Sequence, residues 1–161
     1  MASKTPTELE IVIAETPEDI EAVKSIFQEY LEFIEDFLCQ PLDFQGTEKE
    51  FSTFPDVYDF LLLAKVKGEP VAACGVKAFK DDVAELKRLY ARSSGRGHGL
   101  GEKLTVASMH ESRRRGFKEM YLDTDPGLTH AVAIYEKLGF TDIPRYYENP
   151  MGCSRYMKIS L

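Results

Sequence analysis

The sequence lacks the features that mark several classes of protein. It has three cysteines, Cys39, Cys74 and Cys153, which are too few and too scattered for a disulfide framework. None of them belongs to a CxxC pair, so no redox or metal motif is present. No apolar run reaches the length of a membrane span, and the N-terminal "MASKTPTELEIVIAE" has no apolar signal core. These absences predict a reduced, cytoplasmic protein with no membrane partner and no metal.

The chain also has fewer basic than acidic residues. Twenty basic residues stand against 27 acidic ones, which gives a formal net charge of −7. A nucleic-acid partner is therefore not expected, because such a partner requires a basic surface. A cationic amine would instead be weakly attracted by the field of an acidic protein. With 161 residues, of which 43% are hydrophobic, residues 1–161 are expected to form a single domain with a real core.

Two common phosphate-binding motifs are missing from the most glycine-rich stretch, "YARSSGRGHGLGEKL" at residues 90–104. A Walker A loop needs GxxxxGK[ST], and no glycine here has a second glycine five residues later. The dinucleotide fingerprint GxGxxG fails because Leu100, Glu102 and Leu104 occupy the positions of its last glycine. Nucleotide hydrolysis and nicotinamide binding are therefore not expected.

The same stretch nevertheless has the properties of an anion site. Glycines adopt positive φ at little cost and let a ligand approach the main chain closely. Consecutive amides in such a loop, together with the free N–H groups of the following helix, attract an anion such as a pyrophosphate. Arg96 and His98 can add side-chain hydrogen bonds. The alternative is a flexible surface turn, but the strand before the loop and the helix after it favour the anion site.

The order of the predicted elements indicates a mixed α/β sheet with helices on its faces. The first helix begins with Thr16 as its cap and Pro17 in its first turn. Apolar residues at helical spacing predict its buried face: Ile20, Val23, Phe27, Tyr30, Ile34 and Phe37. A short helix is possible at residues 47–51. The other predicted elements are a strand at 9–14, three strands within 60–91, a helix at about 99–115, a strand at 117–124, a helix at 127–140 and strands within 140–150 and 153–161.

Three segments together resemble the GNAT superfamily of acetyl-CoA-dependent N-acetyltransferases. They are "LKRLYARSSGRGHGLGEKL", "GFKEMYLDT" and "AVAIYEKLGF", and the RxxGxG signature of the family appears as Arg96, Gly99 and Gly101. The resemblance covers residues 58–161 well. It implies an α/β fold with a mixed, mostly antiparallel sheet of about seven strands and helices on both faces. It also implies transfer of an acetyl group from acetyl-CoA to a primary amine, either on a small molecule or at a peptide N-terminus.

The resemblance also implies how acetyl-CoA is held. The pantetheine arm would pair with the strand before the loop, where a backbone N–H would polarise the thioester carbonyl. One such donor typically lowers the barrier by ~3 kcal/mol. The residues expected to hold the cofactor are Leu89, Tyr90, Ala91, Arg96, Gly97, His98, Gly99, Leu100, Gly101 and Glu102.

Proton transfers are assigned to three residues. Tyr135 matches the tyrosine that serves as general acid for the departing thiolate in this family, although its spacing alone would fit a core aromatic. Glu85, on the strand before the loop, is the first choice for the general base, and Asp123 is the second. Each carboxylate taken separately could equally be a solvated strand residue. At the position of a common cofactor-binding asparagine the chain has Leu128, so that contact is not expected.

Other interpretations stay open. The chain could be a non-catalytic module that senses or binds acyl-CoA, although a pure binder would have no need of Tyr135. Transfer of a longer acyl group is a weaker alternative. The acceptor amine has no recognisable signature, and the sequence predicts no interface, although relatives in this family are often homodimers.

Overall fold

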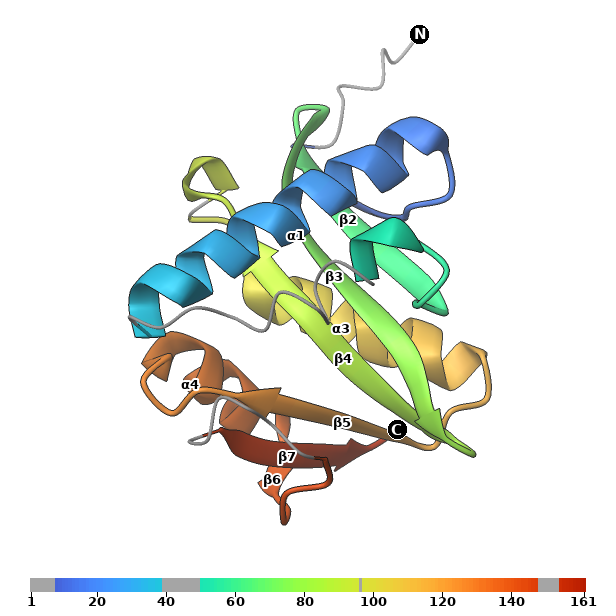
Figure 1. The fold of residues 1–161 in the computed structure, drawn as a ribbon, viewed down its shortest axis with the longest axis vertical. Helices are drawn as coiled ribbons and strands as arrows, with labels where there is room; N and C mark the ends of the chain where they lie inside the picture. Colours follow the sequence, from blue (N-terminus) through green and yellow to red (C-terminus); the bar gives the residue numbers. More distant parts are fainter. Residues whose placement is uncertain (1–7, 39–49, 96, 148–153) are drawn as a thin grey trace, which may run out of the picture.

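One seven-stranded sheet runs through the part of the chain that the computed structural model describes, residues 8–38, 50–95, 97–147 and 154–161 (Figure 1). The strand order is β1-β2-β3-β4-β5-β7-β6, and every neighbouring pair is antiparallel except the parallel pair β4 and β5. The mixed, mostly antiparallel sheet expected from the sequence is thereby confirmed. The strand bounds are Leu9–Ile13 (β1), Phe60–Val66 (β2), Glu69–Lys80 (β3), Val83–Ala91 (β4), Glu119–Thr124 (β5), Thr141–Asp142 (β6) and Arg155–Ser160 (β7).

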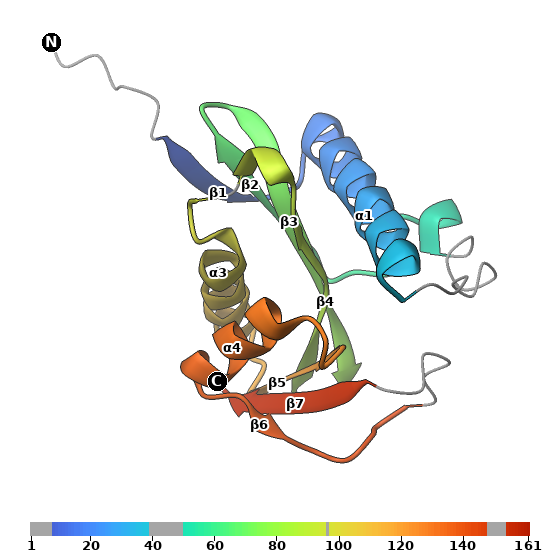
Figure 2. The ribbon, with the colours of Figure 1, turned by 90° about the vertical axis from the view of Figure 1, so that its left-hand side faces the viewer.

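Helices cover both faces of this sheet (Figure 2). Helix α1, Pro17–Leu38, packs on one face against β2, β3 and β4. Helices α3, Leu100–Arg114, and α4, Thr129–Leu138, lie on the opposite face and contact each other. Each face consequently has its own core, one containing Phe27 under α1 and one containing Leu104 under α3.

Helix α1 begins as its sequence predicts, but its buried face ends earlier than predicted. The hydroxyl of Thr16 accepts a hydrogen bond from the Asp19 backbone N–H at 3.1 Å, which caps the first turn. The buried face runs to Ile34. The prediction that Phe37 belongs to it is wrong, because the last turns of α1 extend past the strands (Figure 1). There Phe37 is 42% exposed and stacks on Phe33 with 6.0 Å between ring centroids.

The last third of the chain contains less strand than predicted. Strand β6 has only two residues, Thr141–Asp142, and residues 143–147 form no strand. Pro144 explains part of this, because proline has no N–H to donate to a ladder. The rest of that prediction, residues 148–150, lies outside the described residues, as do residues 47–49 of the possible short helix. The strand predicted within 153–161 is confirmed as β7.

Candidate active site

Strands β4 and β5 pair over only part of their length. The parallel ladder joins Val83–Glu85 to Glu119–Tyr121 and has no further pair among the described residues. Beyond it, β5 continues to Thr124 paired with β7, while β4 continues to Ala91 paired with β3. Figure 1 shows the two strands diverging toward the end of β4. A gap therefore opens in the sheet beside the second half of β4, and we refer to it as the β4–β5 gap.

A β-bulge in β4 lies where the gap opens. Two β4 residues, Arg88 and Leu89, stand opposite the single β3 residue between Ala73 and Gly75. Arg88 has φ 59°, which is uncommon for a residue other than glycine. Bulges bend a strand and redirect its side chains, and they are frequent next to active sites. This bulge therefore bends β4 at the β4–β5 gap.

The glycine loop connects β4 to α3 at the open end of the gap. It begins with the short helix η1, Ser93–Gly95. Gly97 and Gly99 have φ values of 92° and 63°, which other residues seldom adopt. A β-carbon at Gly97 would meet nothing within 4 Å, and one at Gly99 would meet only Lys103 Cε, at 4.0 Å. These two glycines therefore present open main chain, whereas Arg96 lies outside the described residues.

The other two glycines of the loop serve close packing. A β-carbon on Gly95 would lie 2.6 Å from Leu100 Cδ1, and one on Gly101 would lie 3.1 Å from Ile134 Cδ1 of α4. Helix α3 starts after Gly99 with no side-chain cap, so its first N–H groups lack a side-chain acceptor. Free N–H groups and the helix dipole together favour an anion at such an end.

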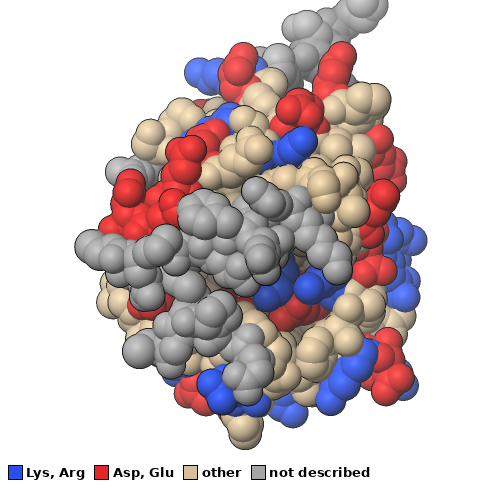
Figure 3. Space-filling view, viewed as in Figure 1, with Lys and Arg blue, Asp and Glu red and all other residues tan. Residues whose placement is uncertain are grey.

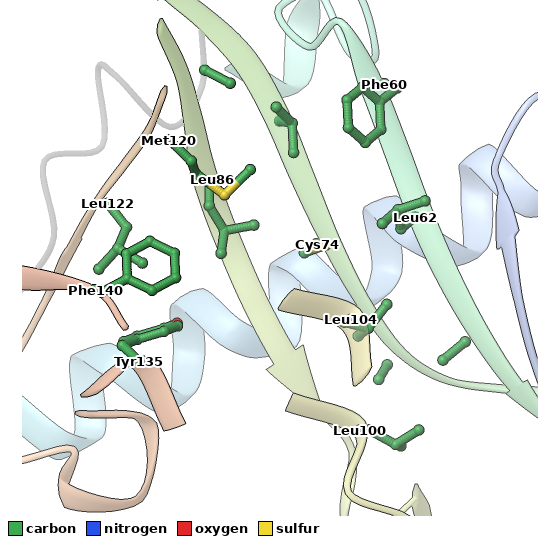
Figure 4. Packing of buried hydrophobic residues seen from close by; sticks show 14 of the residues in the cluster. Phe60, Leu62, Cys74, Leu86, Leu100, Leu104, Met120, Leu122, Tyr135 and Phe140 are labelled. Carbon is green, nitrogen blue, oxygen red and sulfur yellow. The ribbon is translucent and has the colours of Figure 1, made fainter. Parts of the chain in front are cut away.

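Tyr135 of α4 is buried, with 6% of its surface exposed. Its ring packs edge-on against Phe140, with 5.6 Å between centroids, and its oxygen points toward β4 (Figure 4). Burial raises the pKa of Tyr135, and the charges of Tyr30, Cys74 and Asp123 raise it further. Tyr135 is therefore a core aromatic whose polar end faces the strand that borders the β4–β5 gap.

Glu85 is a buried carboxylate at the last pair of the β4–β5 ladder. Only 3% of the residue is exposed, so it is not a solvated strand residue. The Tyr146 hydroxyl donates a hydrogen bond to Glu85 Oε2 at 2.6 Å. The ammonium of Lys87 lies 3.3 Å from the same oxygen, and that of Lys77 lies 3.8 Å from Oε1. Glu85 is thus held in a defined position at the closed end of the gap.

Asp123 of β5 lies close to the same lysine. Its Oδ1 is 3.5 Å from Lys87 Nζ, which also lies 4.9 Å from the ring centroid of Tyr147. Burial raises the pKa of Tyr147, and the charge of Asp123 and a hydrogen bond to it raise this pKa further. The two candidate bases, Glu85 and Asp123, consequently share one ammonium group.

Aromatic side chains surround the tyrosine that contacts Glu85. Burial raises the pKa of Tyr146, and the charge of Glu85 and the hydrogen bond between them raise it further, so the hydroxyl stays protonated and can donate. Tyr146 therefore both donates a hydrogen bond to Glu85 and packs among other rings. Its ring centroid lies 4.9 Å from that of Phe79, 5.2 Å from Tyr121, 5.3 Å from Tyr147 and 5.4 Å from Tyr156.

A glycine loop at the mouth of a sheet gap fits the family that the sequence resembles. The model of the acetyltransferase (GNAT) family matches residues 20–140. The chain belongs to the GNAT family. It is therefore an acyltransferase of the acetyl-CoA-dependent class, as the resemblance implied.

A curated relative and several solved structures match this GNAT chain over nearly its whole length. An uncharacterized N-acetyltransferase of Schizosaccharomyces pombe is 31% identical over 163 residues, which span 97% of each chain. The fold is similar to that of an acetyltransferase from Streptococcus agalactiae, with a TM-score of 0.76, 19% identity and coverage of 96% of this chain and 99% of that one. A Salmonella typhimurium protein solved with acetyl-CoA as its cofactor has a TM-score of 0.62 at 16% identity, covering 96% and 94% of the two chains.

Most of the predicted site residues of this GNAT chain border the same gap. Residues 89–91 lie on β4 beyond its last pair with β5, and residues 97–102 form the loop and the first turn of α3. The Glu102 carboxylate pairs with Lys137 at 3.0 Å, so its side chain is engaged away from the loop. His130 is exposed and does not cap α4, which has no side-chain cap bond.

Sequence reasoning missed a second polar group on the α1 side of β4. Arg88 Nη2 donates a hydrogen bond to Glu50 Oε1 at 2.8 Å, and the Tyr58 hydroxyl donates one to Glu50 Oε2 at 2.5 Å. Strand alternation could have placed Lys87 on the face of Glu85. No sequence signal predicts the bulge that brings Arg88 to that face as well.

The described residues also bear on metal binding and on membrane insertion. Within them, no three histidine, cysteine, aspartate or glutamate side chains are arranged to hold a metal ion. Among the helices in those same ranges, none has the length and apolar character that crossing a bilayer requires.

Proposed function

We propose that this chain transfers an acetyl group from acetyl-CoA to a primary amine by direct attack of the amine on the thioester. The observation that carries the proposal is the position of the glycine loop at the open end of the β4–β5 gap, with the polar end of Tyr135 facing the strand that borders this gap. The family uses acetyl-CoA, and membership in it supports the same donor here.

The main chain of the loop fits a diphosphate. Gly97 and Gly99 combine positive φ with open space at their β-carbon positions, so a phosphate oxygen can approach their amides closely. The N–H groups at the start of α3 add the positive end of the helix dipole. In this proposal residues 97–102 hold the diphosphate, and residues 89–91 of β4 pair with the pantetheine arm.

Glu85 is the proposed general base. A lysine-like amine has a pKa of about 10.4, so it must lose a proton before it attacks. Glu85 takes this proton directly or through a water molecule. The neutral amine then forms the new C–N bond as the C–S bond breaks, and the second proton that the nitrogen loses replaces the one that Tyr135 gives to sulfur. Tyr146 supports the role because its hydrogen bond orients the carboxylate. Asp123 is the alternative base, since it shares Lys87 with Glu85.

Tyr135 is the proposed acid. Its raised pKa keeps the phenol protonated at the pH values at which amines become reactive. The hydroxyl can therefore donate a hydrogen bond, and finally its proton, to the sulfur that leaves with the electrons of the C–S bond.

A screen of amines tests this proposal. The protein is mixed with acetyl-CoA and a panel of amino acids, polyamines and peptides with free N-termini, and free thiol and the mass of the product are recorded. We expect amine-dependent thiol release with one acetyl group added to the product. Tight CoA binding without turnover on any amine would instead favour an acyl-CoA sensor. Parallel assays with propionyl- and succinyl-CoA measure the preference for chain length.

A further inference from the structure

The bulge in β4 gives two consecutive basic side chains the same orientation. Leu86 and Leu89, three positions apart, both pack into the core on the α3 side of the sheet. Lys87 and Arg88, which lie between them, both contact acidic groups on the opposite side, where α1 packs. In a regular strand these two side chains would face opposite ways. The bulge therefore adds Arg88 to the face that carries Glu85.

The two cations differ in how fully they are paired. Lys87 has two carboxylates within 3.5 Å, those of Glu85 and Asp123. The Arg88 guanidinium has five N–H donors. Its Nη2 bonds Glu50, but its Nε is buried and has no hydrogen-bond partner in the described structure. Leaving a charged donor buried without a partner is costly. Nε itself is buried, but 28% of the Arg88 side chain is exposed, so a ligand can approach this side chain.

The surroundings of Arg88 limit the charge of such a ligand. Figure 3 shows basic and acidic side chains side by side in a hollow near the centre of the α1 face. Three carboxylates on this face, those of Glu50, Glu85 and Asp123, already contact Arg88 or Lys87. A phosphate dianion would be repelled by them more strongly than a single carboxylate. A carboxylate also matches the planar guanidinium, which can bind its two oxygens together.

We propose that Arg88 binds a carboxylate of the acceptor, so that the acceptor is a small amine that carries its own carboxylate, as an amino acid does. This inference rests on the proposed function for the amine end of the acceptor, which lies at Glu85. Arg88 follows Glu85 by three positions on β4, so one short molecule spans both groups. The N-terminus of a long peptide has no main-chain carboxylate at that distance and is disfavoured.

Calorimetric titration tests this recognition without requiring turnover. CoA-saturated protein is titrated with common L-amino acids, with their carboxamides and with a peptide that has a free N-terminus. We expect at least one amino acid to bind about 10- to 100-fold more tightly than its carboxamide, the range for one charge-assisted hydrogen bond. In Arg88→Asn the ratio falls toward one. Asparagine tolerates positive φ, so the variant keeps the bulge.

Lys67→Asn is the matched control. Lys67 is exposed in the turn between β2 and β3 and has φ 52°, so the change removes the same charge at the same kind of backbone position. We expect the wild-type ratio in this variant. If Arg88→Asn does not fold, Arg88→Lys keeps the charge without the planar fork and should give an intermediate ratio.

The outcomes separate this inference from the proposed function. Equal affinity of wild type for acids and carboxamides, no binding of either, or an equal loss of both in Arg88→Asn overturns the carboxylate site. If amino acids bind through Arg88 but thiol release never follows, the proposed acetyl transfer is contradicted and the carboxylate site is supported. If amines are acetylated without preference for a carboxylate, acetyl transfer is supported and the carboxylate site is contradicted.

Discussion

The two sides of the β4–β5 gap are built from different parts of the chain. The side proposed for the cofactor consists largely of main chain, in one continuous segment from β4 through the glycine loop into α3. The side proposed for the acceptor consists of side chains from separate elements, with Glu85 on β4, Asp123 on β5 and Tyr146 after β6. Side-chain substitutions on the acceptor side should therefore change turnover and leave CoA affinity intact. Backbone changes in the loop should instead weaken CoA binding and leave turnover of the CoA-loaded protein largely unchanged.

Tyr135→Phe should give the largest effect on turnover. The change removes one oxygen and leaves the ring packed against Phe140. We expect kcat to fall about 1000-fold, within the range for loss of a general acid, while the Kd of CoA stays within twofold. Stopped-flow thiol release and calorimetry measure the two quantities. An unchanged kcat would show that Tyr135 is not the general acid.

Substituting each candidate base in turn should show which one takes the proton. Glu85→Gln is expected to lower kcat/KM about 100-fold, because the buried carboxylate is the proposed proton acceptor. Asp123→Asn should lower it less, because Asp123 is linked to Glu85 only through the shared Lys87 ammonium. Steady-state rates of both variants on one amine decide between them. The reverse order of effects would assign the base to Asp123.

Gly99→Val tests the cofactor side. A branched side chain at φ 63° would cover the open amides, and we expect CoA to bind about 30-fold more weakly, as after loss of roughly one charge-assisted hydrogen bond. Gly116→Val is the control, because Gly116 has φ 96°, open space around it and a place at the other end of α3. Equal CoA affinity in the two folded variants would contradict the loop assignment.

Tyr146→Phe should give the smallest effect. It removes the hydrogen bond that orients Glu85 and keeps the aromatic packing. Because the carboxylate base itself remains, kcat should fall only about fivefold, less than the full contribution of a charge-assisted hydrogen bond. Tyr121→Phe removes a hydroxyl from a neighbouring ring in the same way, at a residue whose hydroxyl makes no hydrogen bond to Glu85 among the described residues. A loss in both variants alike would show that Tyr146 matters only for packing.

The cofactor side was largely predictable from the sequence. Glycines at fixed spacing between a strand and a helix report backbone conformation directly, and the observed φ values at Gly97 and Gly99 fit that expectation. The caps also carried local signals, such as Thr16 at the start of α1 and Gly139, with φ 103°, at the end of α4. These features depend on residues that are close together in the chain.

The acceptor side was only partly predictable. Glu85 could be named as a candidate, but its burial depends on Tyr146, which lies 61 positions away. Arg88 and Glu50 meet because of a bulge with no sequence signature. The prediction that Phe37 is buried is wrong because helical periodicity does not report where the sheet beneath a helix ends.

The most direct test follows the backbone amides of the loop by ¹H–¹⁵N correlation spectra as CoA is added. We predict large, saturable shifts at Gly97, Gly99 and Gly101, and none at Gly116, which lies in the turn at the opposite end of α3. CoA that binds with comparable affinity while the loop glycines do not shift would contradict the account.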